Sequence, residues 1–150
     1  MRPIDPLEPR ILCKHHHPIS PIPSPGSPDS TIMFAAIGDY GFKGVGEPES
    51  AKLVNGWSPD FIITLGDNNY PDGASSTIDR NIGQYFHDFI YPYKGKYGAG
   101  SPTGENRFFP VPGNHDWKAS GLKPYLSYFN LPHNERYYDF VAGPVHVFML

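Results

Sequence analysis

Three short polar clusters in this sequence carry residue types that suit metal binding. They are GDYG at 38–41, GDNNY at 66–70 and GNHD at 113–116. Carboxylate and amide oxygens, with a phenolate and an imidazole, suit hard divalent or trivalent cations better than soft copper. Two carboxylates can hold two metal ions about 3.5–4 Å apart, and such a pair activates water and clamps a phosphoryl group. The clusters therefore indicate metal-dependent phosphoryl chemistry.

Each cluster follows a short apolar run of strand length. The runs are TIMFAAI at 31–37, DFIITL at 60–65 and RFFPV at 107–111. The first two read as strands buried on both faces, because they are continuously apolar. Helices are predicted over 47–56 and from Ser76, where STID has the pattern of a capping box. This alternation predicts an α/β fold with a mostly parallel sheet.

The rest of the chain predicts one more helix and two more strands. The helix is expected over 122–129, and the strands over 137–140 and 145–150. In an open α/β sheet the carboxyl ends of parallel strands line one crevice. We therefore expect the clusters to converge there, bringing together Asp39, Asp67, Tyr70, Asn114, His115 and Asp116.

Each cluster taken alone is typical of an ordinary turn, because Gly and Asp are common turn residues. The case for a site depends on all three clusters occurring in order, each after a predicted strand. Asn68 and Asn69 are interpreted as turn formers without a chemical role.

Composition excludes several classes of function. The chain has 150 residues and a formal net charge of -3, so it lacks the basic face expected of a nucleic-acid-binding protein. Cys13 is its single cysteine, which excludes an intrachain disulfide and a thiolate zinc site. No apolar run approaches the ~20 residues of a membrane span. The N-terminus shows no secretory signal pattern, and the sequence predicts no particular compartment.

Residues 1–30 differ from the rest in being rich in Pro and Ser. We predict a disordered tail there and a folded domain over 31–150. His15–His17 fall in this tail, and we interpret them as a polar patch rather than a metal site.

The ordered set G-D-x-G, G-D-x-x-Y and G-N-H-D resembles the first three metal motifs of the calcineurin-like metallophosphoesterases. Tyr70 in the second motif narrows the resemblance to the purple acid phosphatases, and LGDNNYPDG and PVPGNHDW are most similar to their small, tartrate-resistant type. Gly41 stands where other branches usually carry His. The resemblance covers residues 31–150 and implies the N-terminal half of an α/β/β/α sandwich with a mostly parallel sheet.

The resemblance implies a role for each candidate residue. Asp39 resembles the carboxylate that holds the ferric ion, and Asp67 the carboxylate that bridges both metals. Tyr70 resembles the phenolate on the ferric ion. Asn114 resembles the amide ligand of a divalent iron, zinc or manganese ion. His115 resembles the catalytic histidine that contacts the phosphate and protonates the leaving group.

The implied function is acid phosphatase activity on phosphate monoesters, by a hydroxide activated at an Fe(III)–M(II) centre. Two alternatives stay open: a phosphodiesterase of the same superfamily, and an inactive fragment that lacks the C-terminal His ligands. The family has three further histidines, two of them in a G-H-x-H motif that this sequence lacks. His133 is interpreted as a loop residue and His146 as a strand residue. We therefore expect the chain to be the N-terminal part of a longer enzyme, or a truncated gene product.

Asp116 matches the third motif but has no ligand role to carry over from the family. We interpret it as a hydrogen-bond partner of His115.

Overall fold

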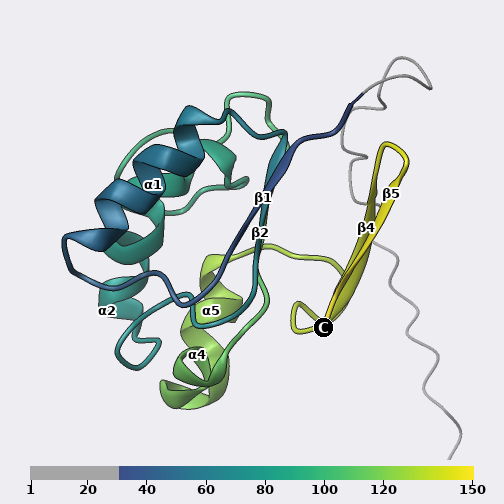
Figure 1. Ribbon diagram of the computed structural model, residues 1–150. Coiled ribbons are helices and arrows are strands. Elements are labelled where there is room, and N and C mark those ends of the chain that lie inside the picture. The colour runs from purple at the N-terminus through teal and green to yellow at the C-terminus, as the bar shows by residue number, and fades with distance from the viewer. Residues whose placement is uncertain (1–30) are drawn as a thin grey trace, which may run out of the picture.

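A computed structural model describes residues 31–150 of the chain (Figure 1). The predicted disordered tail and the His15–His17 patch lie outside the described residues. Among residues 31–150, no helix is long and apolar enough to cross a membrane.

A three-stranded parallel sheet forms the centre of the fold. Its strands lie in the order β1-β2-β3, with Ala36 opposite Ile63 and Ile63 opposite Phe109. The strands are β1 (Phe34–Ile37), β2 (Phe61–Thr64) and β3 (Phe108–Phe109). The predicted α/β fold with parallel strands is confirmed, and the third strand is shorter than expected.

The helical segments are mostly short and connect the strands. They are α1 (Gly46–Gly56), α2 (Ser75–Ile78), a π-helical turn (Asp79–Gly83), α3 (Gln84–Phe86), a 3₁₀ turn (His87–Phe89), α4 (Asn114–Lys118), a 3₁₀ turn (Ser120–Leu122) and α5 (Lys123–Tyr128). The predicted helix over 47–56 is confirmed as α1. The cluster GNHD is not a plain loop, because α4 begins inside it at Asn114.

The predicted capping box at Ser76 is wrong. The N-cap of α2 is Ala74, and its side chain makes no capping hydrogen bond. Ser76, the residue expected to cap the helix, lies inside α2. Asp79, the acid that would complete the box, instead accepts hydrogen bonds from Tyr93 OH at 2.6 Å and from Tyr128 OH at 2.8 Å. Tertiary partners therefore occupy the carboxylate that the box required.

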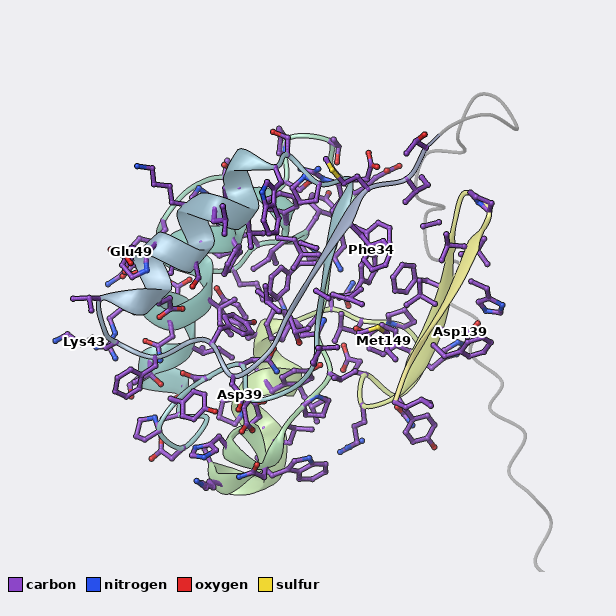
Figure 2. All side chains as sticks on the ribbon, viewed as in Figure 1. Phe34, Asp39, Lys43, Glu49, Asp139 and Met149 are labelled. Atoms are coloured by element: carbon purple, nitrogen blue, oxygen red, sulfur yellow. The ribbon has the colours of Figure 1, made fainter. Side chains whose placement is uncertain are left out.

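An antiparallel hairpin packs on one face of the sheet (Figure 1). Strand β4 (Tyr138–Ala142) pairs with β5 (Val145–Met149) as a separate sheet. Phe140 of the hairpin stacks on Phe109 with ring centroids 3.9 Å apart and meets Phe61 edge-on at 5.4 Å. Figure 2 shows Phe34 and Met149 in the space between sheet and hairpin. The order helices, sheet, hairpin is consistent with the N-terminal half of the implied sandwich.

The two residues of β3 show how the sheet is buried on both faces. Phe108 contacts Phe86 and Phe129 of the helical layer, whereas Phe109 contacts the hairpin. Adjacent strand residues point to opposite faces, so each phenylalanine enters a different half of the core. The expectation of burial on both faces is met by β2 and wrong for β1.

Strand β1 lies at the edge of this sheet. The hairpin packs over β2 and β3 rather than over β1. Phe34 is 44% exposed although it stacks on Phe61. Ala36 is exposed as well, whereas Ala35 on the opposite face is buried.

Candidate metal centre

Two aspartates occupy equivalent positions at the carboxyl ends of β1 and β2. Asp39 and Asp67 each follow a glycine, and both have a backbone φ of 51°, in the left-handed region. This region is uncommon for residues other than Gly, although Asp tolerates it better than most. The amide of Asp39 donates to Gly66 O at 3.3 Å, so the two turns run side by side. The carboxyl groups therefore reach the same edge of the sheet.

The phenol of Tyr70 joins the two carboxylates. Its hydroxyl lies 2.9 Å from Asp39 Oδ1 and 3.2 Å from Asp67 Oδ2, so its single proton is shared between the two carboxylates. Three hard oxygen donors from two loops thus converge, as the sequence predicted. Desolvation, followed by the hydrogen bond to Asp39, raises the pKa of Tyr70 above its ordinary value. Only a strongly acidic cation displaces such a proton, and ferric iron is one.

His115 lies beside this group of oxygens. Its backbone N–H donates to Asp67 Oδ1 at 2.8 Å. Its ring centroid is 4.3 Å from that of Tyr70, and its Nδ1 is 2.6 Å from Pro71 O. The ammonium group of Lys118 is 3.0 Å from the same nitrogen. The third cluster is therefore attached directly to the second through Asp67.

Asn114 is the first residue of α4, between Gly113 and His115. Its side chain is exposed and has no hydrogen-bond partner in the part of the chain that the structure describes. The backbone brings Asn114 to the same edge as the other candidates, while its amide group is not fixed there. Over residues 31–150, no cluster of three or more His, Cys, Asp or Glu residues is arranged to hold a metal ion.

The oxygen donors at this edge of the sheet suit one of the two metals that the resemblance implies. Asp39, Asp67 and Tyr70 supply two carboxylates and a phenol within hydrogen-bond distance of one another. This all-oxygen set fits a hard trivalent cation such as Fe(III). For a second metal, the candidate ligands in this chain are Asp67 and Asn114, and these two residues do not complete its ligand shell.

The interpretation of Asp116 as a partner of His115 is wrong. Asp116 Oδ2 accepts hydrogen bonds from the amide of Asn68 at 3.0 Å, from Asn68 Nδ2 at 2.9 Å and from the amide of Gly113 at 2.9 Å. The carboxyl group is buried, and burial raises its pKa. Asp116 therefore connects the second cluster to the third through buried hydrogen bonds.

Asn68 was interpreted as a turn former, and the structure gives it a larger role. It is fully buried, and its Oδ1 accepts from Thr64 Oγ1 at 2.6 Å and Tyr40 OH at 3.0 Å. Its Nδ2 donates to Val111 O at 2.7 Å and to Asp116. One side chain thus connects all three clusters. Its position behind an apolar strand is the available sequence signal, because a polar side chain buried there needs partners.

Asn69 and Asn81 form a second buried set of hydrogen bonds. Asn69 Nδ2 donates to Ala74 O at 2.9 Å, and its Oδ1 accepts from Asn81 Nδ2 at 3.0 Å. Asn81 Nδ2 also lies 2.7 Å from Gly41 O and 3.0 Å from Tyr70 O. These contacts fix the backbone on both sides of the Tyr70–Asp39 pair. The sequence offered no indication that Asn81 takes part.

Two glycines allow the clusters to approach each other. Gly41 has φ +62°, and a Cβ there would collide with the backbone of Asn68. A Cβ on Gly113 would collide with the amide and carboxylate of Asp67. Steric contact with Asn68 therefore accounts for a glycine at position 41.

His133 and His146 belong to the hairpin region instead. His146 Nε2 is 2.7 Å from Asp139 Oδ2, and His133 Nε2 is 3.3 Å from Asp139 Oδ1. These contacts lower the pKa of Asp139. Figure 2 shows Asp139 on the hairpin, away from Asp39. The interpretation of His146 as a strand residue and His133 as a loop residue is confirmed.

Comparison with known proteins agrees with this geometry. The family model described as calcineurin-like phosphoesterase matches residues 32–148. The chain belongs to the calcineurin-like phosphoesterase family. The match spans all three clusters, so the predicted membership of this family is confirmed.

Purple acid phosphatases of Arabidopsis thaliana are among the relatives of this phosphoesterase chain. Purple acid phosphatase 17 is 29% identical over 99 residues, which is 63% of this chain and 27% of that protein. Purple acid phosphatase 3 is 30% identical over 99 residues, covering 63% of this chain and 25% of that protein. The chain thus spans about a quarter of the length of these relatives. No solved structure is significantly similar to it.

Proposed function

We propose that this phosphoesterase hydrolyses phosphate monoesters as an acid phosphatase. The proposal is carried by one observation, the phenol of Tyr70 hydrogen-bonded to the carboxylates of both Asp39 and Asp67. A phenol beside two carboxylates suits a ferric ion, and the names of the relatives point in the same direction.

Each candidate residue has a proposed role in an Fe(III)–M(II) centre. Asp39 and Tyr70 would hold the ferric ion, Asp67 would serve both metals, and Asn114 would bind the divalent iron, zinc or manganese ion. When bound, the two metals lower the pKa of a water molecule toward neutrality and clamp the phosphoryl group. The chain supplies part of the ligand shell of the second metal.

His115 is the proposed general acid. Its backbone is held by Asp67 Oδ1, and its ring is held by Tyr70, Pro71 and Lys118. This packing keeps the imidazole at the edge of the centre, where it donates a proton to the leaving oxygen of the ester. Nδ1 lies 2.6 Å from Pro71 O, so Nε2 is the proposed donor to the substrate, and Lys118 Nζ is 3.2 Å from this nitrogen.

A test combines metal analysis with two substrates, on protein purified at its natural length. We expect hydrolysis of p-nitrophenyl phosphate to exceed that of bis-p-nitrophenyl phosphate. The reverse preference would favour the phosphodiesterase alternative. Absence of both activities in metal-loaded protein would favour the inactive alternative.

A matched pair of variants tests the bridge. Asp67→Asn is expected to lose both metals by elemental analysis, because an amide is a poorer ligand than a carboxylate. Asp72→Asn, in the same loop and exposed, is expected to keep them. Retention of both metals in Asp67→Asn would exclude Asp67 as the bridging ligand.

A further inference from the structure

Within residues 31–150, Lys118 is the one cationic side chain that contacts the candidate site residues. Its Nζ lies 3.0 Å from Nδ1 and 3.2 Å from Nε2 of His115, three residues earlier in α4. The other hydrogen bonds of the candidate side chains join them to one another or to the carbonyl of Pro71. Lys118 is exposed, and it forms no salt bridge with a carboxylate in the described part of the chain. Its charge is therefore available to an anionic ligand.

The contacts of the His115 ring decide which of its nitrogens faces the lysine. Nδ1 lies 2.6 Å from the carbonyl oxygen of Pro71, which only accepts hydrogen bonds, so Nδ1 carries a proton. The acceptor of the neutral ring is then Nε2, and an N–H of Lys118 donates to it. Nε2 is also the nitrogen proposed to face the leaving oxygen of the ester. A substrate that approaches Nε2 therefore takes the place of the lysine N–H.

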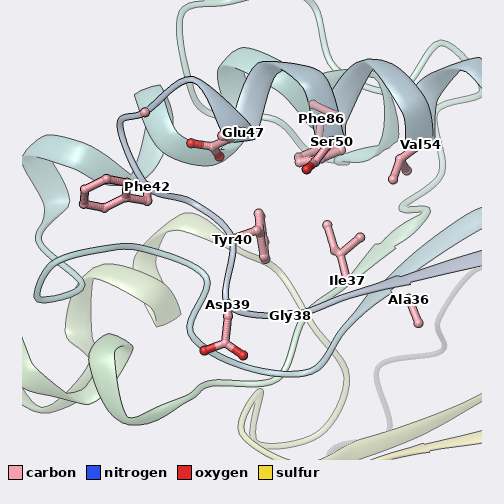
Figure 3. Close-up of a pocket in the computed structure, with 13 residues that line it drawn as sticks. Ala36, Ile37, Gly38, Asp39, Tyr40, Phe42, Glu47, Ser50, Val54 and Phe86 are labelled. Atoms are coloured by element: carbon pink, nitrogen blue, oxygen red, sulfur yellow. The ribbon is translucent and has the colours of Figure 1, made fainter.

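The cavity beside β1 is unsuited to a phosphate group. It has a volume of about 510 Å³ and lies between the end of β1, the loop that follows and the first turns of α1 (Figure 3). Among the described residues that line it, the charged ones are Asp39 and Glu47, and both are acids. Figure 3 shows the carboxyl group of Asp39 directed away from α1. An anionic group is therefore better accommodated beside Lys118 than in this cavity.

We propose that Lys118 binds the phosphoryl group of the ester and releases Nε2 of His115 as the substrate arrives. This inference rests on the proposed function, because it takes the sheet edge near Asp39 and Asp67 as the place of the phosphoryl group. An ammonium group donates strong, charge-assisted hydrogen bonds to phosphate oxygens. The phosphoryl group of a monoester carries up to two negative charges, whereas that of a diester carries one. Lys118 therefore favours monoesters over diesters.

The first test measures binding of inorganic phosphate by calorimetry, on protein purified at its natural length and loaded with Fe(III) and Zn(II) to equal metal content. Lys118→Met removes the charge and keeps a long side chain, and we expect phosphate to bind at least about tenfold more weakly. Lys123→Met changes an exposed lysine at the start of α5 and should leave the affinity within about twofold. Unchanged affinity in Lys118→Met, or no phosphate binding by the unmodified protein, would overturn the proposal.

The second test compares the two kinds of ester. We expect Lys118→Met to lower kcat/KM for p-nitrophenyl phosphate at least about tenfold, and that for bis-p-nitrophenyl phosphate less than about threefold. The reason is that the doubly charged monoester loses more from the missing ammonium group than the singly charged diester does. A residue that only supported the structure would affect both esters alike. Equal losses for the two esters would therefore contradict the proposal.

Lys118→Arg tests whether the contact depends on the charge. Arginine keeps a positive charge and N–H donors on a long side chain. We expect its phosphate affinity to stay within about fivefold of that of the unmodified protein. An affinity as low as that of Lys118→Met would refute a contact made through the charge of the side chain.

The two tests separate this inference from the proposed function, because phosphate binding is measured without turnover. Phosphate binding that depends on Lys118, in protein that hydrolyses neither ester, would support the role of Lys118 and refute the acid phosphatase. Hydrolysis of the monoester, with phosphate affinity and ester preference unchanged in Lys118→Met, would support the acid phosphatase and refute the role of Lys118.

Discussion

Tyr70 and Asp39 are 31 residues apart in the sequence, yet the phenol of Tyr70 donates a hydrogen bond to Asp39 Oδ1 at 2.9 Å. The contact joins the ends of two neighbouring parallel strands. It brings together a phenol and a carboxylate that have no local reason to meet. The proposed metal chemistry depends on this pair and on Asp67 beside it.

Tyr70→Phe tests the pair directly. The substitution removes both hydrogen bonds of the phenol, and we expect it to cost about 0.5–1.5 kcal/mol of folding free energy, because the ring stays in place. In ferric-loaded protein we expect a visible absorption band that the variant lacks. Tyr137→Phe, at an exposed tyrosine, should keep the band. An unchanged colour in Tyr70→Phe would refute the phenolate assignment.

Asn68→Ala is expected to destabilise the metal-free protein by about 2–4 kcal/mol. The reason is that Thr64 Oγ1, Tyr40 OH and Val111 O lose their buried partner. Chemical denaturation followed by circular dichroism measures the change. Asn114→Ala, at an exposed asparagine, should shift the unfolding free energy by less than about 0.5 kcal/mol. Similar losses in both variants would contradict the scaffold role of Asn68.

Gly113→Ala tests the close approach of the second and third clusters. Its φ is −100°, which any residue adopts, so the effect is purely steric. The added methyl group meets the amide and carboxylate of Asp67, and we expect a loss of about 1–3 kcal/mol in unfolding free energy. Gly46→Ala meets nothing within 4 Å at the start of α1 and should be neutral or stabilising. Equal stabilities of the two variants would show that the loops separate without cost.

The pH dependence of stability tests the burial of Glu47. Burial raises the pKa of Glu47 from 4.5 to about 8, so the folded state binds this proton more tightly than the unfolded state. Stability should therefore fall as the pH rises between these two values. Melting temperatures of Glu47→Gln should decline less over that range than those of the unmodified chain. Parallel curves for the two proteins would show that Glu47 is solvated.

The fold was largely predictable because apolar periodicity and turn residues act locally. The runs that became β1, β2 and β3 were recognisable, as were α1 and the hairpin strands. The expected capping box failed because Tyr93 and Tyr128, 14 and 49 residues from Asp79, donate to the carboxylate that it required. The exposure of Phe34 was unpredictable, since it depends on where the hairpin packs over the sheet.

The sequence by itself determined that three polar clusters follow three strands, and hence that their carboxyl groups share one edge of the sheet. Only the tertiary structure decided which polar side chains face that edge. Asp39, Asp67 and Tyr70 meet there, whereas Asn68 and Asp116 turn inward and hold the clusters together. Asn68 and Asp116 are 48 residues apart in the sequence and are hydrogen-bonded to each other, because a buried amide and a buried carboxylate both need hydrogen-bond partners. Such a pairing depends on distant backbone positions that no local pattern encodes.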